Sequence, residues 1–211
     1  MSHKFNFFKS PLFYLTLTII FLLALLLIKI NDNFPVQVFI LTPALILFPL
    51  WSFQERIFKF AEIGEIERVA KHINQLKDTK LKGKIGYRIL HIASDKGHQE
   101  LVDILAKRGV NINALCEDSF TALHRAVLSN HLEVVKTLIN YGAEVNCQDI
   151  NGFTSLHIAV INNNLEIIST LIENEAQVNS RLLNGTTPLS LALQSENQEI
   201  VGFLSSHGGI N

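Results

Sequence analysis

Three histidines recur along the chain at one interval: His91, His124 and His157 are separated by 33 residues each. Imidazole is a common metal ligand and a proton carrier near neutral pH, so such a row could form a metal site or a proton relay. Stacked helices, however, lie about 8 to 10 Å apart, whereas zinc holds its nitrogen ligands at about 2 Å. The spacing argues against both kinds of site, and no metal or cofactor is expected.

Other residues that could perform chemistry do not form a catalytic pattern. The chain has no phosphate-binding glycine loop, no Gly-x-Ser-x-Gly, no His-Glu-x-x-His and no nucleophile beside a base at a recognisable spacing. Cys116 and Cys147 are 31 residues apart and have no Cys-x-x-Cys pairing for zinc. They are therefore either two free thiols or one disulfide. The protein is therefore not expected to be an enzyme.

The charge balance also limits the classes of partner. The chain carries 18 basic and 19 acidic residues, a net charge of −1 and a pI of about 6.7. It has no basic stripe, which is the electrostatic signature of nucleic-acid binding. Neither a nucleic acid nor a small-molecule substrate is expected.

The histidines belong to a longer repeat. Residues 120–127, FTALHRAV, return as FTSLHIAV at residues 153–160. A period of this length sets the architecture of a chain. It defines four copies, at residues 83–115, 116–148, 149–181 and 182–211.

Each copy is predicted to be a pair of helices. In the second copy, Thr121 can cap a helix start, Leu123 and Ala126 recur at helical spacing, and Gly142 ends a second apolar run. One such pair cannot enclose its own apolar face, so the copies must stack on each other. The fold class is therefore predicted to be all-α, built as a solenoid.

Several motifs in these copies resemble ankyrin repeats. They are Thr-Pro-Leu at 187–189, Thr-x-Leu-His-x-Ala at 121–126 and 154–159, and YGAEVN at 141–146, and the resemblance covers 83–211 without an insertion. It implies an ankyrin-repeat solenoid of four repeats that binds other proteins. The ankyrin-bearing acyltransferases of membranes need a cysteine-rich Asp-His-His-Cys segment, which this chain lacks.

The two ends of the repeat array depart from the pattern. A fainter copy, FKFAEIGEIERVAKHI, occupies residues 58–73, so residues 54–82 are predicted to form a degenerate N-terminal cap. The last copy has Ser190 in place of the histidine and Gly202 inside its second helix. Terminal repeats with a polar outer face keep a solenoid soluble.

The resemblance also implies structural roles. Each histidine of the row is expected to bond backbone or hydroxyl groups and to tie its loop to the next repeat, and each threonine before a first helix is expected to cap it. These structural residues are His91, His124, His157, Thr121, Thr154 and Thr187.

Residues 1–53 are predicted to form an N-terminal membrane anchor. Residues 12–28 contain no charge and thirteen Leu, Ile or Phe, which together favour insertion as a helix by roughly 4 to 8 kcal/mol. A first span is expected over about 12–30, with a cleaved signal peptide as the alternative. A second span is expected over 34–53, which is uncharged although it contains two prolines.

The positions of the basic residues predict the orientation of this transmembrane hairpin. Lys4 and Lys9 precede the first span, and Arg56 and Lys59 follow the second. Basic residues favour the cytoplasmic side, so the ankyrin domain is predicted to be cytoplasmic and the protein to be integral to the membrane. If the second segment does not cross, the repeats lie on the opposite side.

A protein partner would, by the resemblance, be held by the loop tips and the exposed side of the first helices. Tyr87, Phe120 and Phe153 form an aromatic row before the helix starts, and these rings either anchor a partner or pack on neighbouring loops. Apolar residues at positions expected to be exposed favour a protein partner over a small ligand. The candidate residues are Lys84, Ile85, Tyr87, Asp95, Lys96, Glu117, Asp118, Phe120, Leu128, Ser129, Ile150, Asn151, Phe153, Ile161, Asn162 and Arg181.

Together these patterns predict a membrane-anchored protein–protein interaction adaptor, whose partners are another protein and the lipid bilayer. Anchoring raises the effective concentration toward other membrane-associated proteins without any new contact. One alternative is an immunity or antitoxin-type inhibitor that blocks an effector protein at the membrane. Another is a regulated channel or transporter subunit, although Lys29 and Asp32 are placed at the bend of the hairpin rather than within a span.

Overall fold

The computed structural model describes residues 55–76, 81–116 and 118–211. The predicted membrane spans, about 12–30 and 34–53, lie outside these residues. In the part of the chain that is described, no helix combines the length and the apolar character needed to cross a membrane.

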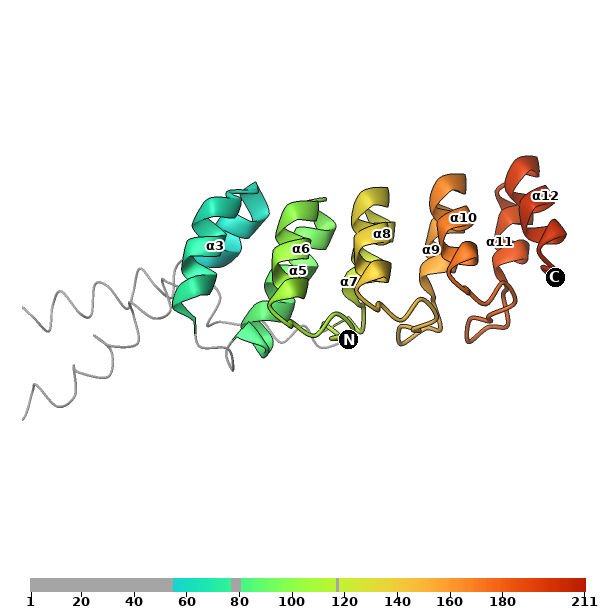
Figure 1. The fold of residues 1–211 in the computed structure, drawn as a ribbon. Coiled ribbons are helices and arrows are strands. Elements are labelled where there is room, and N and C mark those ends of the chain that lie inside the picture. The colour runs from blue at the N-terminus through green and yellow to red at the C-terminus, as the bar shows by residue number, and fades with distance from the viewer. Residues whose placement is uncertain (1–54, 77–80, 117) are drawn as a thin grey trace, which may run out of the picture. The chain divides into compact units, whose positions relative to one another are not determined.

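All regular secondary structure in the described residues is helical, and the helices lie in pairs side by side in chain order (Figure 1). Residues 55–63 are helical. The helices after them are α3 (Ile66–Gln75), α5 (Lys84–Asp95), α6 (Gln99–Lys107), α7 (Ala122–Leu128), α8 (Leu132–Asn140), α9 (Ser155–Ile161), α10 (Leu165–Glu173), α11 (Pro188–Gln194) and α12 (Gln198–Ser206). This arrangement is the all-α solenoid expected from the repeat.

The first helices of the last three repeats begin in the same way. Thr121, Thr154 and Thr187 have an extended backbone, and each hydroxyl accepts a hydrogen bond from the third N–H of α7, α9 or α11. A side-chain oxygen at this position satisfies one of the N–H groups that a helix leaves free at its start. In α11 the next residue, Pro188, also suits the first helical position.

The first helix of the first repeat departs from this pattern. α5 starts at Lys84 and has no side-chain cap. The position that matches the capping threonines holds Arg88, and it lies inside the helix. The helix is therefore about one turn longer at its N-terminal end than α7, α9 and α11.

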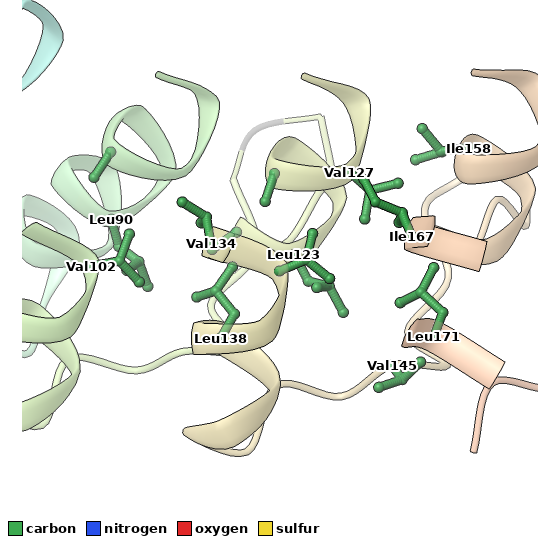
Figure 2. Packing of buried hydrophobic residues seen from close by; sticks show 14 of the residues in the cluster. Leu90, Val102, Leu123, Val127, Val134, Leu138, Val145, Ile158, Ile167 and Leu171 are labelled. Carbon is green, nitrogen blue, oxygen red and sulfur yellow. The ribbon is translucent and has the colours of Figure 1, made fainter. Parts of the chain in front are cut away.

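Neighbouring pairs pack first helix on first helix and second helix on second helix. α7 contacts α5 and α9, and α8 contacts α6 and α10. Figure 2 shows Leu123, Val134 and Leu138 between the helices of one pair, with the neighbouring helix pairs on either side. These side chains are almost completely buried and belong to one continuous core, and burying each stabilises the fold by about 1.5 to 3 kcal/mol.

A periodic asparagine joins the end of each repeat to the next. The side chain of Asn146 donates to the carbonyl oxygen of Glu175 at 2.9 Å and accepts from the N–H of Gln177 at 2.7 Å. Asn113 and Asn179 make the same two bonds one repeat earlier and one repeat later. Each asparagine thus satisfies two backbone groups at the end of the following second helix.

The turns between the two helices of a pair form a second line of contacts along the stack. The ring of His131 lies against Gly97, where an added Cβ would come within 2.7 Å of it, and Nε2 lies 3.0 Å from the carbonyl oxygen of Asp95. Gly97 has a φ of +75°, a conformation that glycine adopts without a steric penalty. Further along, Asn164 donates to the side chain of Asn130 at 3.1 Å instead. The same repeat positions therefore make the contact between successive turns, although the residues at those positions differ.

Candidate partner-binding surface

Two histidines of the row complete the caps of their own helices. The N–H of Thr121 donates to Nδ1 of His124 at 3.2 Å, and the N–H of His124 donates back to the Thr121 hydroxyl at 3.3 Å. Thr154 and His157 repeat this box in the next copy. Because Nδ1 accepts a hydrogen bond, the proton of each neutral ring is assigned to Nε2.

Both rings are completely shielded from solvent. Burial lowers the pKa of His124 and of His157, because the charged form would lose its hydration. The backbone of Phe153 acts in the other direction and raises the pKa of His124. Nε2 of both rings, however, has no well-aligned hydrogen-bond partner among the described residues. We therefore regard these backbone contacts as electrostatic rather than as full hydrogen bonds, and the rings as neutral structural groups.

His91 is held differently because the helix around it starts earlier. Its Nδ1 lies 2.6 Å from the carbonyl oxygen of Tyr87 on the preceding turn, and its Nε2 lies 3.0 Å from that of Phe120 in the next repeat. All three histidines thus face backbone or hydroxyl groups. Across the residues that the structure describes, no three or more His, Cys, Asp or Glu side chains gather where they could hold a metal ion.

The aromatic row lies directly beside the histidines. The ring centroids of Tyr87 and Phe153 are 6.0 Å from those of His91 and His157, in an edge-on arrangement. Phe120 stacks on its own histidine at 5.3 Å. All three rings are half-buried, so part of each ring packs on the fold and part remains accessible to a partner.

Several candidate residues make bonds within the stack. The hydroxyl of Ser129 donates to the Asp95 carboxylate at 3.1 Å, and the side chain of Asn162 donates to the carbonyl oxygen of Val127 at 2.9 Å. Asp118 pairs with Arg125 across a short loop. These contacts hold the side chains in place within the stack.

Other candidates present apolar surface to solvent. Leu128 is 44% exposed, Ile150 is 73% exposed and Ile161 is 51% exposed. Leu183, which sequence reasoning missed, is 81% exposed and occupies the repeat position of Ile150 one copy later. The backbone joins these two loop tips, because the N–H of Leu183 donates to the carbonyl oxygen of Asn151 at 3.1 Å.

The remaining candidates are mostly charged. Lys84, Lys96 and Arg181 are exposed, whereas Ile85 is half-buried. Glu117 lies outside the described residues. The candidate set is therefore a mixed surface, in which Leu128, Ile150 and Ile161 are the exposed apolar members.

A groove of about 690 Å³ crosses the N-terminal part of the stack. It is lined by Glu55, Arg56, Phe58, Lys59, Glu62, Arg88, His91, Ile92, Asp95, Lys96, Cys116 and Arg125. Of the predicted partner-binding residues only Asp95 and Lys96 line it. Helical spacing could have identified three more lining residues. Ile92 and Arg88 lie about one and two turns before Asp95 and Lys96 on the same helix, and Arg125 occupies the repeat position of Ile92.

Both cysteines are free thiols. Cys116 donates to the Asp118 carboxylate at 2.6 Å in the groove wall. Burial raises the pKa of Cys116 and of Cys147, with Asp118 adding to the effect at Cys116. The thiol form is therefore favoured, and neither sulfur is activated as a nucleophile.

The family assignment rests on comparison with known proteins. The family model described as ankyrin repeats (3 copies) matches residues 58–149 and 141–211, which together cover 154 of the 211 residues. No curated protein matches the chain. The motifs, the stacked helix pairs and this match agree, and the chain belongs to the ankyrin-repeat family.

Proposed function

We propose that this protein is a membrane-anchored adaptor whose ankyrin repeats bind another protein at the cytoplasmic face of a membrane. Ankyrin repeats are protein-binding modules rather than catalysts, and affinity and location are then the whole mechanism. The partner is held by the loop tips and the exposed side of the first helices. Residues 1–53 hold the repeats at the bilayer.

The observation that carries the binding proposal is the apolar surface at equivalent places in successive repeats. Ile150 and Leu183 are the most exposed large apolar residues of the described chain, and they stand on adjacent loop tips. Leu128 and Ile161 repeat the pattern at the ends of α7 and α9. Apolar residues that gather on adjacent exposed loops, as Ile150 and Leu183 do, mark an interaction site more often than apolar residues scattered singly.

The experiment is a crosslinking pull-down of the full-length protein from its native membranes. The test variant combines Ile150→Ser with Leu183→Ser, and the matched control is Ile210→Ser, which alters a residue that is 53% exposed at the C-terminal end. We expect the main partner to be lost from the double variant and kept by the control. Recovery of the same partner by a folded double variant would remove the loop tips from the proposal.

The membrane part of the proposal is supported by the uncharged stretches 12–28 and 34–53. Full-length protein is expected to remain with the bilayer after a carbonate wash, without N-terminal cleavage. The repeats are expected to resist protease added to sealed right-side-out vesicles and to be digested in inverted vesicles. Release by carbonate would contradict the anchor, and digestion in the right-side-out vesicles would contradict the cytoplasmic orientation.

A further inference from the structure

The groove of about 690 Å³ is assembled from three parts of the chain. The helix at residues 55–63 supplies Phe58 and Lys59, α5 supplies Arg88 and Ile92, and α7 supplies Arg125. The N-terminal cap is therefore one wall of a concave surface as well as the end of the stack. Without the cap helix the groove has no such wall.

Arg88 is the best-placed binding group in this groove. Its guanidinium carbon lies 4.1 Å from the centre of the Phe58 ring, and Phe58 is itself buried. Stacking on an aromatic face orders a guanidinium and leaves its N–H edges available for a carboxylate. Arg88 makes no ion pair with any described residue, although the neighbouring Lys96 is paired with Asp95 at 3.1 Å.

The charge around the groove is positive, in contrast to the rest of the stack. Five basic and three acidic side chains line it, and one of the basic groups, Arg125, is paired with Asp118 just outside the lining. The formal excess with that partner counted is one positive charge. Residues 54–96 carry ten basic and six acidic residues, a net charge of +4, whereas residues 97–211 carry five and twelve, a net charge of −7. An acidic partner is therefore attracted to this end and repelled from the other end.

We infer that the groove binds an acidic segment of a partner protein, with a carboxylate on Arg88 and an adjacent apolar side chain against Ile92. This inference rests on the proposed protein-binding function and names the chemistry of the partner. A carboxylate matches the planar donor fork of arginine in a bidentate pair. Ile92 is half-buried at the groove surface, so it offers an apolar contact beside that pair.

A protein segment fits this site better than a polyanion or a bilayer. Glu55, Glu62 and Asp95 line the same groove and repel a backbone that carries a charge on every unit. The basic groups also line a concavity, which a flat bilayer surface does not enter. A peptide can place one or two carboxylates at Arg88 and neutral residues beside the three acids.

The test is a selection from a random decapeptide library on the full-length protein in detergent. We expect the selected peptides to be enriched in Asp and Glu, and their affinity to fall as salt is raised. Arg88→Glu should weaken the best peptide by about tenfold or more, the effect of losing one charge-assisted pair. The affinity of Arg88→Lys for the same peptide should lie between those of the parent and Arg88→Glu, because lysine keeps the charge but lacks the planar donor fork of arginine.

Lys136→Glu is the matched control, since Lys136 pairs with Glu133 on α8 and does not line the groove. Thermal unfolding checks that each variant is folded. Selected peptides without an acidic excess, or an affinity that Arg88→Glu leaves unchanged, would overturn the inference. Vesicles of phosphatidylserine provide a second arm, and Arg88-dependent binding to them in place of peptides would also overturn it.

The outcome separates this inference from the proposed function. A native partner that depends on Ile150 and Leu183 but not on Arg88, together with a library that shows no acidic preference, supports the function and refutes the inference. Acidic peptides that depend on Arg88 support the inference even if the loop-tip variant keeps its partner.

Discussion

Several side chains in this protein form hydrogen bonds with backbone groups at the ends of helices. Thr154 and His157 satisfy each other's N–H groups at the start of α9, and neither residue has appreciable exposure. These hydrogen bonds are buried, and a buried donor or acceptor that lacks a partner destabilises the folded protein. The same argument applies to Thr121 and His124 one repeat earlier.

Thr154→Ala is expected to lower the free energy of unfolding by about 1 kcal/mol, because it removes a helix cap. Thr170→Ala is the control, since its hydroxyl donates to the carbonyl oxygen of Glu166 within α10 and caps nothing. We expect the control to change stability by less than about 0.5 kcal/mol. Urea unfolding measures both, and equal losses would show that the cap has no special role.

Glu175 carries backbone strain that can be relieved. It has a φ of +65° after α10, where the corresponding residues after α6 and α8 are Gly109 and Gly142. Glu175→Gly is expected to raise stability by about 0.5 to 1 kcal/mol, since glycine adopts this conformation without a Cβ clash. Glu173→Gly, at the last residue of α10, should instead lower stability by about 1 kcal/mol.

Denaturant midpoints of these two variants test the assignment. If both glycines destabilise the protein, the left-handed conformation of Glu175 is not a source of strain.

At the scale of elements, helix pairs depend on contacts that cross from one repeat to the next. The asparagines at the repeat ends contribute two such hydrogen bonds each, and these bonds join backbone groups about 30 residues apart in the chain. In a solenoid, stability is the sum of weak units and the interfaces between them. Loss of an interface should therefore reduce cooperativity as well as stability.

Asn146→Ala is expected to cost about 1 to 2 kcal/mol, because it leaves the carbonyl of Glu175 and the N–H of Gln177 without their partner. Urea unfolding should also become broader as the last two repeats separate from the others. Asn140→Ala, at an exposed place in the last turn of α8, is the control and should be neutral. A sharp transition with unchanged midpoint in Asn146→Ala would contradict this account of the interface.

At the scale of the whole molecule, two buried neutral histidines connect stability to pH. Burial lowers the pKa of His124 and His157 below the usual value of 6.5. The unfolded chain then binds more protons than the folded chain below that pH. The stability they contribute is fully present above about pH 6.5 and is lost as the pH falls through the lowered folded pKa.

The melting temperature is therefore expected to fall between about pH 7 and pH 5. The double variant His124→Gln, His157→Gln should be less stable at neutral pH but should show a weaker dependence on pH. His207→Gln, at an exposed position after α12, is the control and should keep the parent's dependence. A double variant as sensitive to acid as the parent would exclude the buried rings as the cause.

The distribution of charge is also a property of the whole stack. The excess of acidic residues after residue 97 and of basic residues before it gives the two ends opposite signs. This polarity orients a charged partner toward the groove at Arg88 before any contact is made. It is not visible in the overall net charge of −1.

Much of this fold follows from the sequence because it is determined locally and then repeated. A 33-residue period, a threonine before the first helices of the last three repeats and an apolar set at helical spacing are enough to predict stacked helix pairs, and α7 to α12 follow that pattern. Exposure of Ile150 and Ile161 could be expected for the same reason, since their repeat positions face away from the core. The anchor in residues 1–53 stays a prediction.

Only the tertiary structure decided where the copies differ and what they build together. α5 starts a turn early, so His91 bonds Tyr87 instead of a capping threonine. Phe58, Arg88 and Arg125 line one groove although about 30 to 37 residues separate them, because stacking places equivalent faces of successive pairs side by side. A repeat specifies each unit through short-range contacts, whereas a binding surface depends on how several units are placed relative to one another.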